Sequence, residues 1–144
     1  MTIYTLIVDD NTADRYLLKR RLAKIDLDIQ VLEAENGQAA LEVFSDYQAK
    51  RDADPGTYPP LFVFLDINMP ILDGFGFLSA FHHVTAGPDF APPTVVMFTS
   101  SGRQEDKEKS LHWDFVKEYI VKGDLSPQML RDMMHDHLGS LDAA

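Results

Sequence analysis

Acidic, hydroxyl and basic residues follow the short apolar runs of this 144-residue sequence, at the points where those runs end. They are Asp9 and Asp10, then Asp66, then Thr99 and Ser100, and finally Lys122. Clustered carboxylates repel one another unless a cation lies between them, and such oxygen ligands suit Mg²⁺. A lysine and a hydroxyl group can hold phosphoryl oxygens, and a carboxylate is an established nucleophile for phosphorus. These residue types therefore predict phosphoryl transfer, provided that the fold brings them together.

Each of these residues has a more ordinary interpretation when it is taken singly. An aspartate at the end of a strand is more often a turn residue or a helix cap than a nucleophile. Lys122 alone would be a surface lysine. The prediction of a site therefore depends on all of them lying at the same edge of one sheet.

The apolar runs predict that strand and helix alternate five times. The expected strands are Ile3–Val8, Ile29–Ala34, Leu61–Leu65, Thr94–Phe98 and Tyr119–Val121. The expected helices are one capped by Asn11 or Thr12, then Gln38–Phe44, Leu72–Val84, Glu105–Trp113, and one opened by Ser126 and Pro127. Strands that are apolar throughout are typical of a parallel sheet covered on both faces, whose functional sites form beyond the carboxyl ends of the strands.

Two segments interrupt this alternation. Residues 46–60 and 85–93 each contain three prolines and a glycine, and we expect both to be extended loops. Neither is long enough to separate two domains. Residues 1–144 are therefore predicted to form a single α/β domain.

The composition argues against several classes of protein. The formal net charge of −10 is unsuited to a nucleic-acid-binding surface, because phosphate contacts need clustered Lys and Arg. The apolar runs fall far short of the ~20 residues that cross a membrane, and the N-terminus does not resemble a signal peptide. We therefore expect a cytoplasmic protein. The sequence has no cysteine, which excludes disulfides and thiolate metal sites within it.

Five motifs carry a more specific signal. They are VDDN (residues 8–11), EAENGQAAL (33–41), LDINMPILDG (65–74), FTSS (98–101) and YIVK (119–122). In this order and spacing they resemble the receiver domain of two-component response regulators. The resemblance spans nearly the whole sequence. It implies a flavodoxin-like (βα)5 fold, a three-layer sandwich around a parallel five-stranded sheet in the order 2-1-3-4-5.

The resemblance also implies an acceptor and a metal site. Asp66 matches the aspartate that takes a phosphoryl group from a histidine kinase. Asp10, Asp66 and the backbone carbonyl of Asn68 match the direct ligands of Mg²⁺, while Asp9 acts largely through water. Such a domain is not an enzyme in the usual sense, since it is the phosphoacceptor and assists its own phosphorylation and dephosphorylation.

Three further residues match the signalling machinery of the family. Thr99 matches the switch hydroxyl that meets the phosphoryl group, and Lys122 matches the lysine that pairs with it. Tyr119 matches the aromatic residue that swings inward on phosphorylation. Lys122 is followed by Gly123, where the family usually has a proline in a cis peptide bond. The spacing from Thr99 to Lys122 is slightly longer than is common, which leaves Ser100 open as a substitute for Thr99.

Three alternatives to an active receiver remain open. One is a receiver-like scaffold that binds partners without being phosphorylated, which Gly123 favours. A second is an aspartate-nucleophile phosphatase, which needs an acid two residues after the nucleophile, where this sequence has Asn68. A third is a flavodoxin, which the acidic first loop disfavours because a flavin phosphate needs hydroxyl and amide donors there.

The resemblance implies protein partners. The expected donor is a sensor histidine kinase or a phosphotransfer protein. The two loop segments resemble those of single-domain receivers that partner phytochromes, so we expect a phytochrome-type kinase. Only 22 residues follow Lys122, which predicts no output domain in this sequence. We expect the fourth helix, the fifth strand and the last helix to form the partner surface and a homodimer interface. Met133 and Met134 are expected to face the core. For Trp113, the sequence favours neither the core nor the partner surface.

Overall fold

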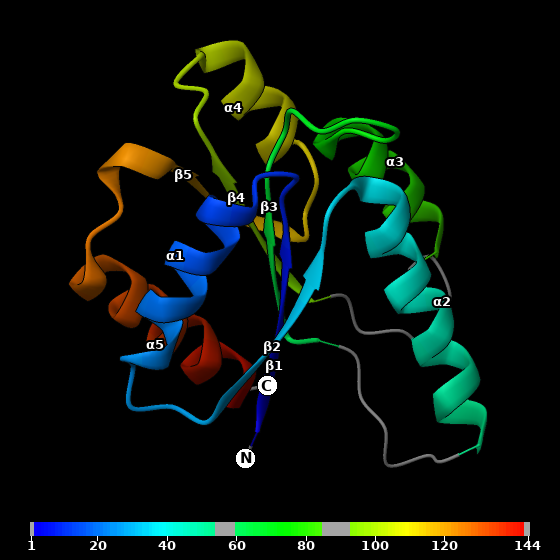
Figure 1. Cartoon of the computed structure of the whole chain (residues 1–144), viewed down its shortest axis with the longest axis horizontal. Coiled ribbons are helices and arrows are strands. Elements are labelled where there is room, and N and C mark those ends of the chain that lie inside the picture. The colour runs from blue at the N-terminus through cyan, green and yellow to red at the C-terminus, as the bar shows by residue number, and fades with distance from the viewer. Residues whose placement is uncertain (1, 54–59, 85–92, 143–144) are drawn as a thin grey trace.

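Five parallel strands form one sheet in the order β2-β1-β3-β4-β5 in the computed structural model, which describes residues 2–53, 60–84 and 93–142 (Figure 1). The strands are β1 (Ile3–Val8), β2 (Ile29–Ala34), β3 (Phe62–Leu65), β4 (Thr94–Thr99) and β5 (Val116–Val121). The helices are α1 (Thr12–Ala23), α2 (Gly37–Ala53), α3 (Gly74–Val84), α4 (Gln104–Leu111) and α5 (Pro127–Asp142), and a 3-10 turn spans Lys122–Asp124. The predicted flavodoxin-like fold and its strand order are confirmed.

Helices cover both faces of the sheet. Helices α1 and α5 lie on one face, and α2 and α3 lie on the other (Figure 1). The buried residues form one hydrophobic cluster on each side of the sheet. Strands β3 and β4 are buried at every position, as predicted for strands that are apolar throughout, whereas the edge strand β2 is largely exposed because only one neighbour covers it.

The prediction of a loop over residues 46–60 is wrong in its first half. Helix α2 continues to Ala53, so residues 46–53 are helical. This segment is polar, but it has no glycine or proline until Pro55, and residues such as Gln, Ala, Lys and Arg favour helix. Residues 54–59, and residues 85–92 of the second predicted loop, lie outside the described part of the chain.

Two further element boundaries differ from those predicted. Strand β5 begins at Val116, three residues before the predicted start, and the charged Lys117 and Glu118 within it concealed the strand pattern. Helix α4 ends at Leu111, two residues before the predicted end at Trp113. Trp113 is partly buried and packs against the cluster on the α2 and α3 side.

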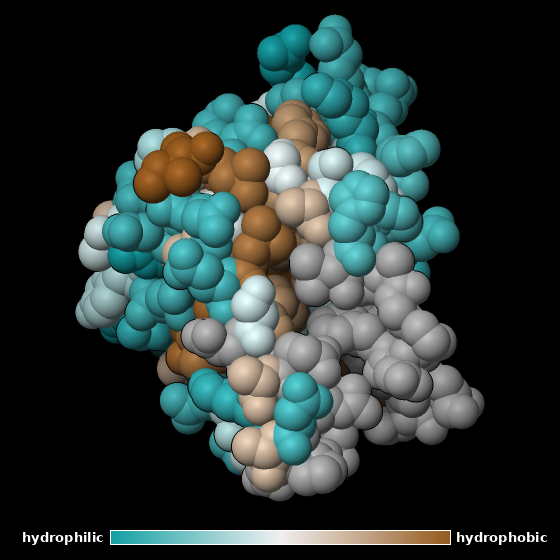
Figure 2. Space-filling view, turned by 90° about the vertical axis from the view of Figure 1, so that its right-hand side faces the viewer, coloured by the Kyte–Doolittle hydropathy of each residue, from teal (hydrophilic) through white to brown (hydrophobic). Residues whose placement is uncertain are grey.

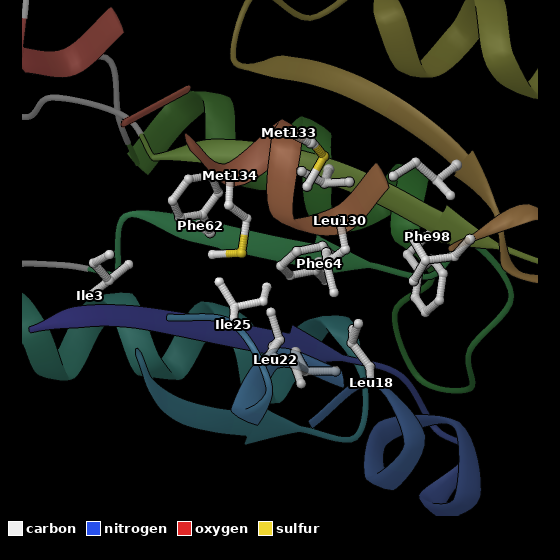
Figure 3. Close-up of a cluster of buried hydrophobic side chains, with 14 of the residues drawn as sticks. Ile3, Leu18, Leu22, Ile25, Phe62, Phe64, Phe98, Leu130, Met133 and Met134 are labelled. Atoms are coloured by element: carbon white, nitrogen blue, oxygen red, sulfur yellow. The ribbon is translucent and has the colours of Figure 1, made fainter. Parts of the chain in front are cut away.

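The methionine pair of α5 faces the core, as predicted. Met133 is 7% exposed and Met134 is 0% exposed. Figure 3 shows both side chains directed from α5 toward the central strands, with Met134 near Phe62. These two methionines therefore stabilise the α5 side of the sheet and are not available to a partner.

The face formed by α2 and α3 is mixed in polarity. Figure 2 views this side and shows hydrophilic side chains over much of its coloured surface, with a band of hydrophobic ones between them. Within the described segments, no helix is both long and apolar enough to cross a membrane.

Candidate functional site

The ends of β1 and β3 place two aspartates side by side. Val8 is paired with Leu65 in the sheet, and the backbone N–H of Asp66 donates to the carbonyl oxygen of Val8 at 3.0 Å. Asp9 and Asp66 are thus the next residues of two neighbouring parallel strands. Their side chains leave the same edge of the sheet, which the apolar runs of the sequence predicted.

Three carboxylates meet at this edge. One oxygen atom from each of Asp9, Asp10 and Asp66 lies within 4.8 Å of the other two. Asp9 and Asp66 are buried, at 3% and 7% exposed, whereas Asp10 is exposed. The structure therefore brings together the three acidic residues that the sequence predicted as metal ligands.

Local hydrogen bonds orient the two buried carboxylates. Oδ1 of Asp9 accepts from the backbone N–H of Asn11 at 2.9 Å, and Oδ1 of Asp66 accepts from the N–H of Ile67 at 2.8 Å. Arg15 donates to the backbone carbonyl of Asp9 at 2.6 Å. The bonds from Asn11 and Ile67 use one oxygen of each carboxylate and leave Oδ2 for other partners.

The ammonium group of Lys122 occupies those remaining oxygens. Its Nζ atom lies 2.6 Å from Oδ2 of Asp9 and 3.2 Å from Oδ2 of Asp66. The Lys122 side chain is 15% exposed. Lys122 is the residue directly after β5, so the chain brings it to Asp66 from the far side of β4.

Burial and charge act in opposite directions on these groups. Burial raises the pKa of Asp9, and the hydrogen bond from Lys122 offsets this only in part. Burial lowers the pKa of Lys122, but its hydrogen bonds with Asp14 and Asp9 and the nearby charge of Asp66 outweigh that effect and raise it above the ordinary lysine value. The surrounding carboxylates therefore favour the charged form of Lys122.

A fourth carboxylate at this edge was not predicted from the sequence. Asp14, in the first turn of α1, accepts a hydrogen bond from Lys122 Nζ at 2.8 Å. The sequence contained the clue that Asp14 lies five residues after Asp9. Because this spacing is also that of an ordinary acidic residue near a helix N-terminus, it does not by itself indicate a contact.

The other predicted site residues are Thr99, Ser100, Tyr119 and Asn68. Among the described residues, no hydrogen bond joins any of them to the acidic cluster. Thr99 is the last residue of β4 and is fully buried, whereas Ser100 is exposed. Tyr119 is partly buried, and its hydroxyl donates to the backbone carbonyl of Ser101 at 2.8 Å. Asn68 is exposed in the loop that follows Asp66.

The loop after β3 is shaped by close backbone contacts. The N–H of Gly74 donates to the carbonyl of Ile67 at 2.7 Å, and a Cβ atom at Gly74 would lie 2.4 Å from the carbonyl oxygen of Asp66. Glycine at this position therefore allows α3 to begin directly beside Asp66. Ile71 in the same loop has a φ of 70° and is 82% exposed, an unusual conformation for a β-branched residue.

The donor set fits a hard divalent cation. Asp9, Asp10 and Asp66 offer only oxygen atoms, two of them from buried carboxylates, and oxygen ligands are what Mg²⁺ prefers. The second buried feature of the site, the Lys122 ammonium, is suited to an anionic group that shares the site with the metal. The arrangement can thus hold a cation and a phosphoryl group together.

Comparisons with known proteins identify the family of the chain. Residues 5–135 match the family model described as the response regulator receiver domain. The chain is 32% identical over 111 residues to the chemotaxis protein CheY of Halobacterium salinarum, covering 77% of this chain and 78% of that protein. It is 30% identical over 139 residues to the probable transcriptional regulator ycf27 of Porphyridium aerugineum, covering 96% of this chain and 49% of that protein. The chain spans half or less of the length of several curated relatives that it matches.

A solved structure supports the fold independently. The receiver domain of the histidine kinase CKI1 from Arabidopsis thaliana, complexed with Mg²⁺, superposes with a TM-score of 0.75 at 18% identity, covering 91% of each chain. At this level of identity the likeness shows the shared fold. The family assignment comes from the sequence match over residues 5–135.

Proposed function

The chain belongs to the response regulator receiver domain family of two-component signalling, and from this membership we propose that Asp66 accepts a phosphoryl group from a phosphohistidine. The observation that carries the proposal is the contact between Lys122 and Asp66, 3.2 Å apart, beside the carboxylates of Asp9 and Asp10. A buried nucleophile, a cation and a metal-binding donor set are the parts that phosphoryl transfer to a carboxylate requires.

In the proposed reaction, a carboxylate oxygen of Asp66 attacks phosphorus. The bond from phosphorus to the imidazole nitrogen of the donor breaks, which leaves an aspartyl phosphate and a free histidine. Asp9, Asp10 and Asp66, with the backbone carbonyl of Asn68, would hold Mg²⁺, and the bound ion supplies positive charge to the phosphoryl oxygens. Lys122 exchanges part of its contact with the carboxylates for a contact with the phosphoryl group.

Signalling then requires a residue that responds to the new phosphoryl group. We assign this role to Thr99 at the end of β4 and to Tyr119 in β5, following the family pattern. The hydrogen bond from Tyr119 to the carbonyl of Ser101 ties β5 to the segment that follows Thr99, which gives a route between the two residues. A change at Thr99 can therefore move a side chain on the β5 side of the molecule.

The proposed partners follow from the same chemistry. The donor is a sensor histidine kinase or a phosphotransfer protein, and residues 1–144 act as one cytoplasmic receiver domain that signals by protein contact. A phytochrome-type kinase as the donor, and a homodimer through α4, β5 and α5, stay predictions of the sequence resemblance.

Intact-mass spectrometry tests the proposal. The protein is incubated with Mg²⁺ and acetyl phosphate, and we expect an adduct of about 80 Da, the mass of a phosphoryl group. Asp66→Asn should remove the adduct, and EDTA should prevent its formation. Asp28→Asn is the matched control. Asp28 is an exposed aspartate directly before β2, so it lies at the opposite end of the strands from the site.

Two outcomes would contradict the proposal. The first is an adduct that persists in Asp66→Asn, which would place the modification elsewhere. The second is the absence of an adduct in the wild-type protein with both acetyl phosphate and a phosphorylated histidine kinase. That second result would favour the scaffold interpretation, in which the chain binds partners without being phosphorylated.

A further inference from the structure

Lys122 has more partners than the proposed reaction uses. Its ammonium group has three donor hydrogens, and it contacts Asp9 at 2.6 Å, Asp14 at 2.8 Å and Asp66 at 3.2 Å. Asp9 and Asp66 belong to the candidate metal site, so their charge and contacts change when a metal and a phosphoryl group bind. Asp14 lies outside that set of three carboxylates. It is therefore the partner that Lys122 can keep throughout the reaction.

The turn that follows Lys122 is open to its surroundings at Gly123. Lys122 begins a 3-10 turn, Gly123 follows it, and no peptide bond in the described part of the chain is cis. A Cβ atom at Gly123 would meet nothing within 4 Å, so no neighbouring group restrains that side of Gly123. The position of the ammonium group thus depends on what the side chain contacts.

Asp14 is well placed to provide that restraint. It lies in the first turn of α1, where its backbone N–H donates to the capping side chain of Asn11 at 3.0 Å. Its side chain is 34% exposed, so the hydrogen bond to Lys122 is partly shielded from water. The contact joins residues that are 108 positions apart in the sequence and links α1 to the end of β5.

We infer that Asp14 is a positioning residue that holds the Lys122 ammonium group beside Asp66 for phosphoryl transfer. The inference rests on the proposed function, because it concerns the rate of that reaction. Asp14 touches neither the phosphorus atom nor the acceptor oxygen, and it acts only through Lys122.

An ordinary role for Asp14 must be distinguished from this one. An aspartate in the first turn stabilises a helix through the helix dipole, whether or not it contacts a lysine. If Asp14 acted only in this way, its removal would have the same effect with or without Lys122. A double-mutant cycle between Asp14 and Lys122 separates the two roles.

The test measures the initial rate of acetyl phosphate labelling by intact mass, in saturating Mg²⁺. Asp14→Ala should slow labelling by about tenfold, the factor that corresponds to losing one hydrogen bond between charged groups. Asp14→Glu, which keeps the carboxylate, should restore part of the rate. In the Lys122→Ala background, Asp14→Ala should change the rate by less than about twofold, because the group it positions is gone.

Other results would overturn the inference. An equal loss of rate from Asp14→Ala with and without Lys122 would assign Asp14 to helix stability alone. An unchanged rate in Asp14→Ala, with the wild-type protein labelled normally, would show that Lys122 needs no such restraint. Asp28→Asn should leave the rate unchanged and controls for the loss of one negative charge.

The same four proteins distinguish this inference from the proposed function. If neither acetyl phosphate nor a phosphorylated histidine kinase labels the wild-type protein, the proposed function fails. Urea unfolding of the wild type, Asp14→Ala, Lys122→Ala and the double variant then still reports whether the two side chains are coupled. Additive effects on the urea midpoint would show that Asp14 does not hold Lys122.

Discussion

Replacing Lys122 by methionine tests the electrostatics of the site in the absence of any phosphoryl group. The substitution keeps an unbranched side chain that is one atom shorter, and it removes the charge. Lys122 is 15% exposed, and its partners Asp9 and Asp66 have side chains that are 4% and 9% exposed. Removing one partner of a buried ion pair costs about 3–5 kcal/mol when the pair is fully buried, and an exposed pair contributes under about 1 kcal/mol. We therefore expect Lys122→Met to lower the free energy of unfolding by about 3 kcal/mol in EDTA.

Mg²⁺ should reduce that loss. Lys122 contacts the same two buried carboxylates that would bind the ion, so the cation and the ammonium group compete for them. A ligand at 100 times its Kd stabilises the folded state by about 2.7 kcal/mol. Without the competing ammonium group, Lys122→Met should bind Mg²⁺ more tightly than the wild type, and the difference in stability between the two should shrink.

Thermal and urea unfolding measure both effects. A loss of about 3 kcal/mol corresponds to a fall in Tm of about 6–12 °C for a chain of this size. Burial already raises the pKa of Asp9, so the loss should diminish as the pH falls toward the range where aspartates become protonated. Lys19→Met is the matched control, since Lys19 pairs with Glu33 at 3.1 Å but the two side chains are 47% and 38% exposed.

Two results would refute this reasoning. In EDTA, Lys122→Met could prove as stable as Lys19→Met, which should lose under about 1 kcal/mol. This would mean that the buried carboxylates are not dependent on the lysine. Alternatively, Mg²⁺ could stabilise Lys122→Met no more than the wild type, in which case Lys122 and the metal do not share ligands.

Four other substitutions have expected outcomes in urea unfolding. Glu33→Gln should lower the free energy of unfolding by under about 1 kcal/mol at pH 7. Hydrogen bonding to Lys19 lowers the pKa of the Glu33 carboxyl group in the folded state. Its contribution to stability is therefore present above the ordinary pKa of 4.5 and is lost as the pH falls through the lower pKa of the folded state. Gly74→Ala should lower the free energy of unfolding by about 2 kcal/mol or more, because the new Cβ would collide with the backbone. Gly139→Ala in α5 should raise it by about 0.5–1 kcal/mol, because a Cβ there would meet nothing within 4 Å. Ile71→Asn should gain about 1 kcal/mol, since asparagine tolerates the left-handed conformation that Ile71 adopts at φ 70°. A loss of stability in Ile71→Asn would show that its exposed side chain is held by contacts that offset the strain.

The acidic edge of the site was predictable from the sequence because two strong rules coincide there. Runs of buried residues ended at Asp9 and Asp66, and parallel strands present their carboxyl ends at one edge. The same reasoning brought Lys122 to the site from β5. This prediction did not require any side-chain contact to be known, because the sheet order places β1, β3 and β4 next to one another.

The contact between Asp14 and Lys122 was not predictable in this way. It joins a helix side chain to a residue 108 positions away, and it depends on how α1 packs against the sheet. The helix predicted over Gln38–Phe44 was found, but its continuation to Ala53 was missed for a different reason, because the polar segment 46–53 has no apolar stripe and leads into Pro55 and Gly56. Periodicity locates elements that bury one face; it does not show how far a solvated helix continues.

The balance of charge at this edge explains why a phosphoryl group and a divalent cation should depend on each other. Four carboxylates lie at this edge, and the ammonium group of Lys122 contacts three of them, those of Asp9, Asp14 and Asp66. With Asp10 included, the fully ionised carboxylates and the one ammonium group sum to a net charge of about −3. Phosphorylation replaces the single charge of Asp66 by a group of about −2, which without a metal would add to this excess. A bound Mg²⁺ more than cancels that increase, and the phosphorylated edge is then less negative than the bare one. If Asp66 is phosphorylated as proposed, the charge of the product would favour a bound divalent cation, and we expect the aspartyl phosphate to form poorly wherever Mg²⁺ is withheld.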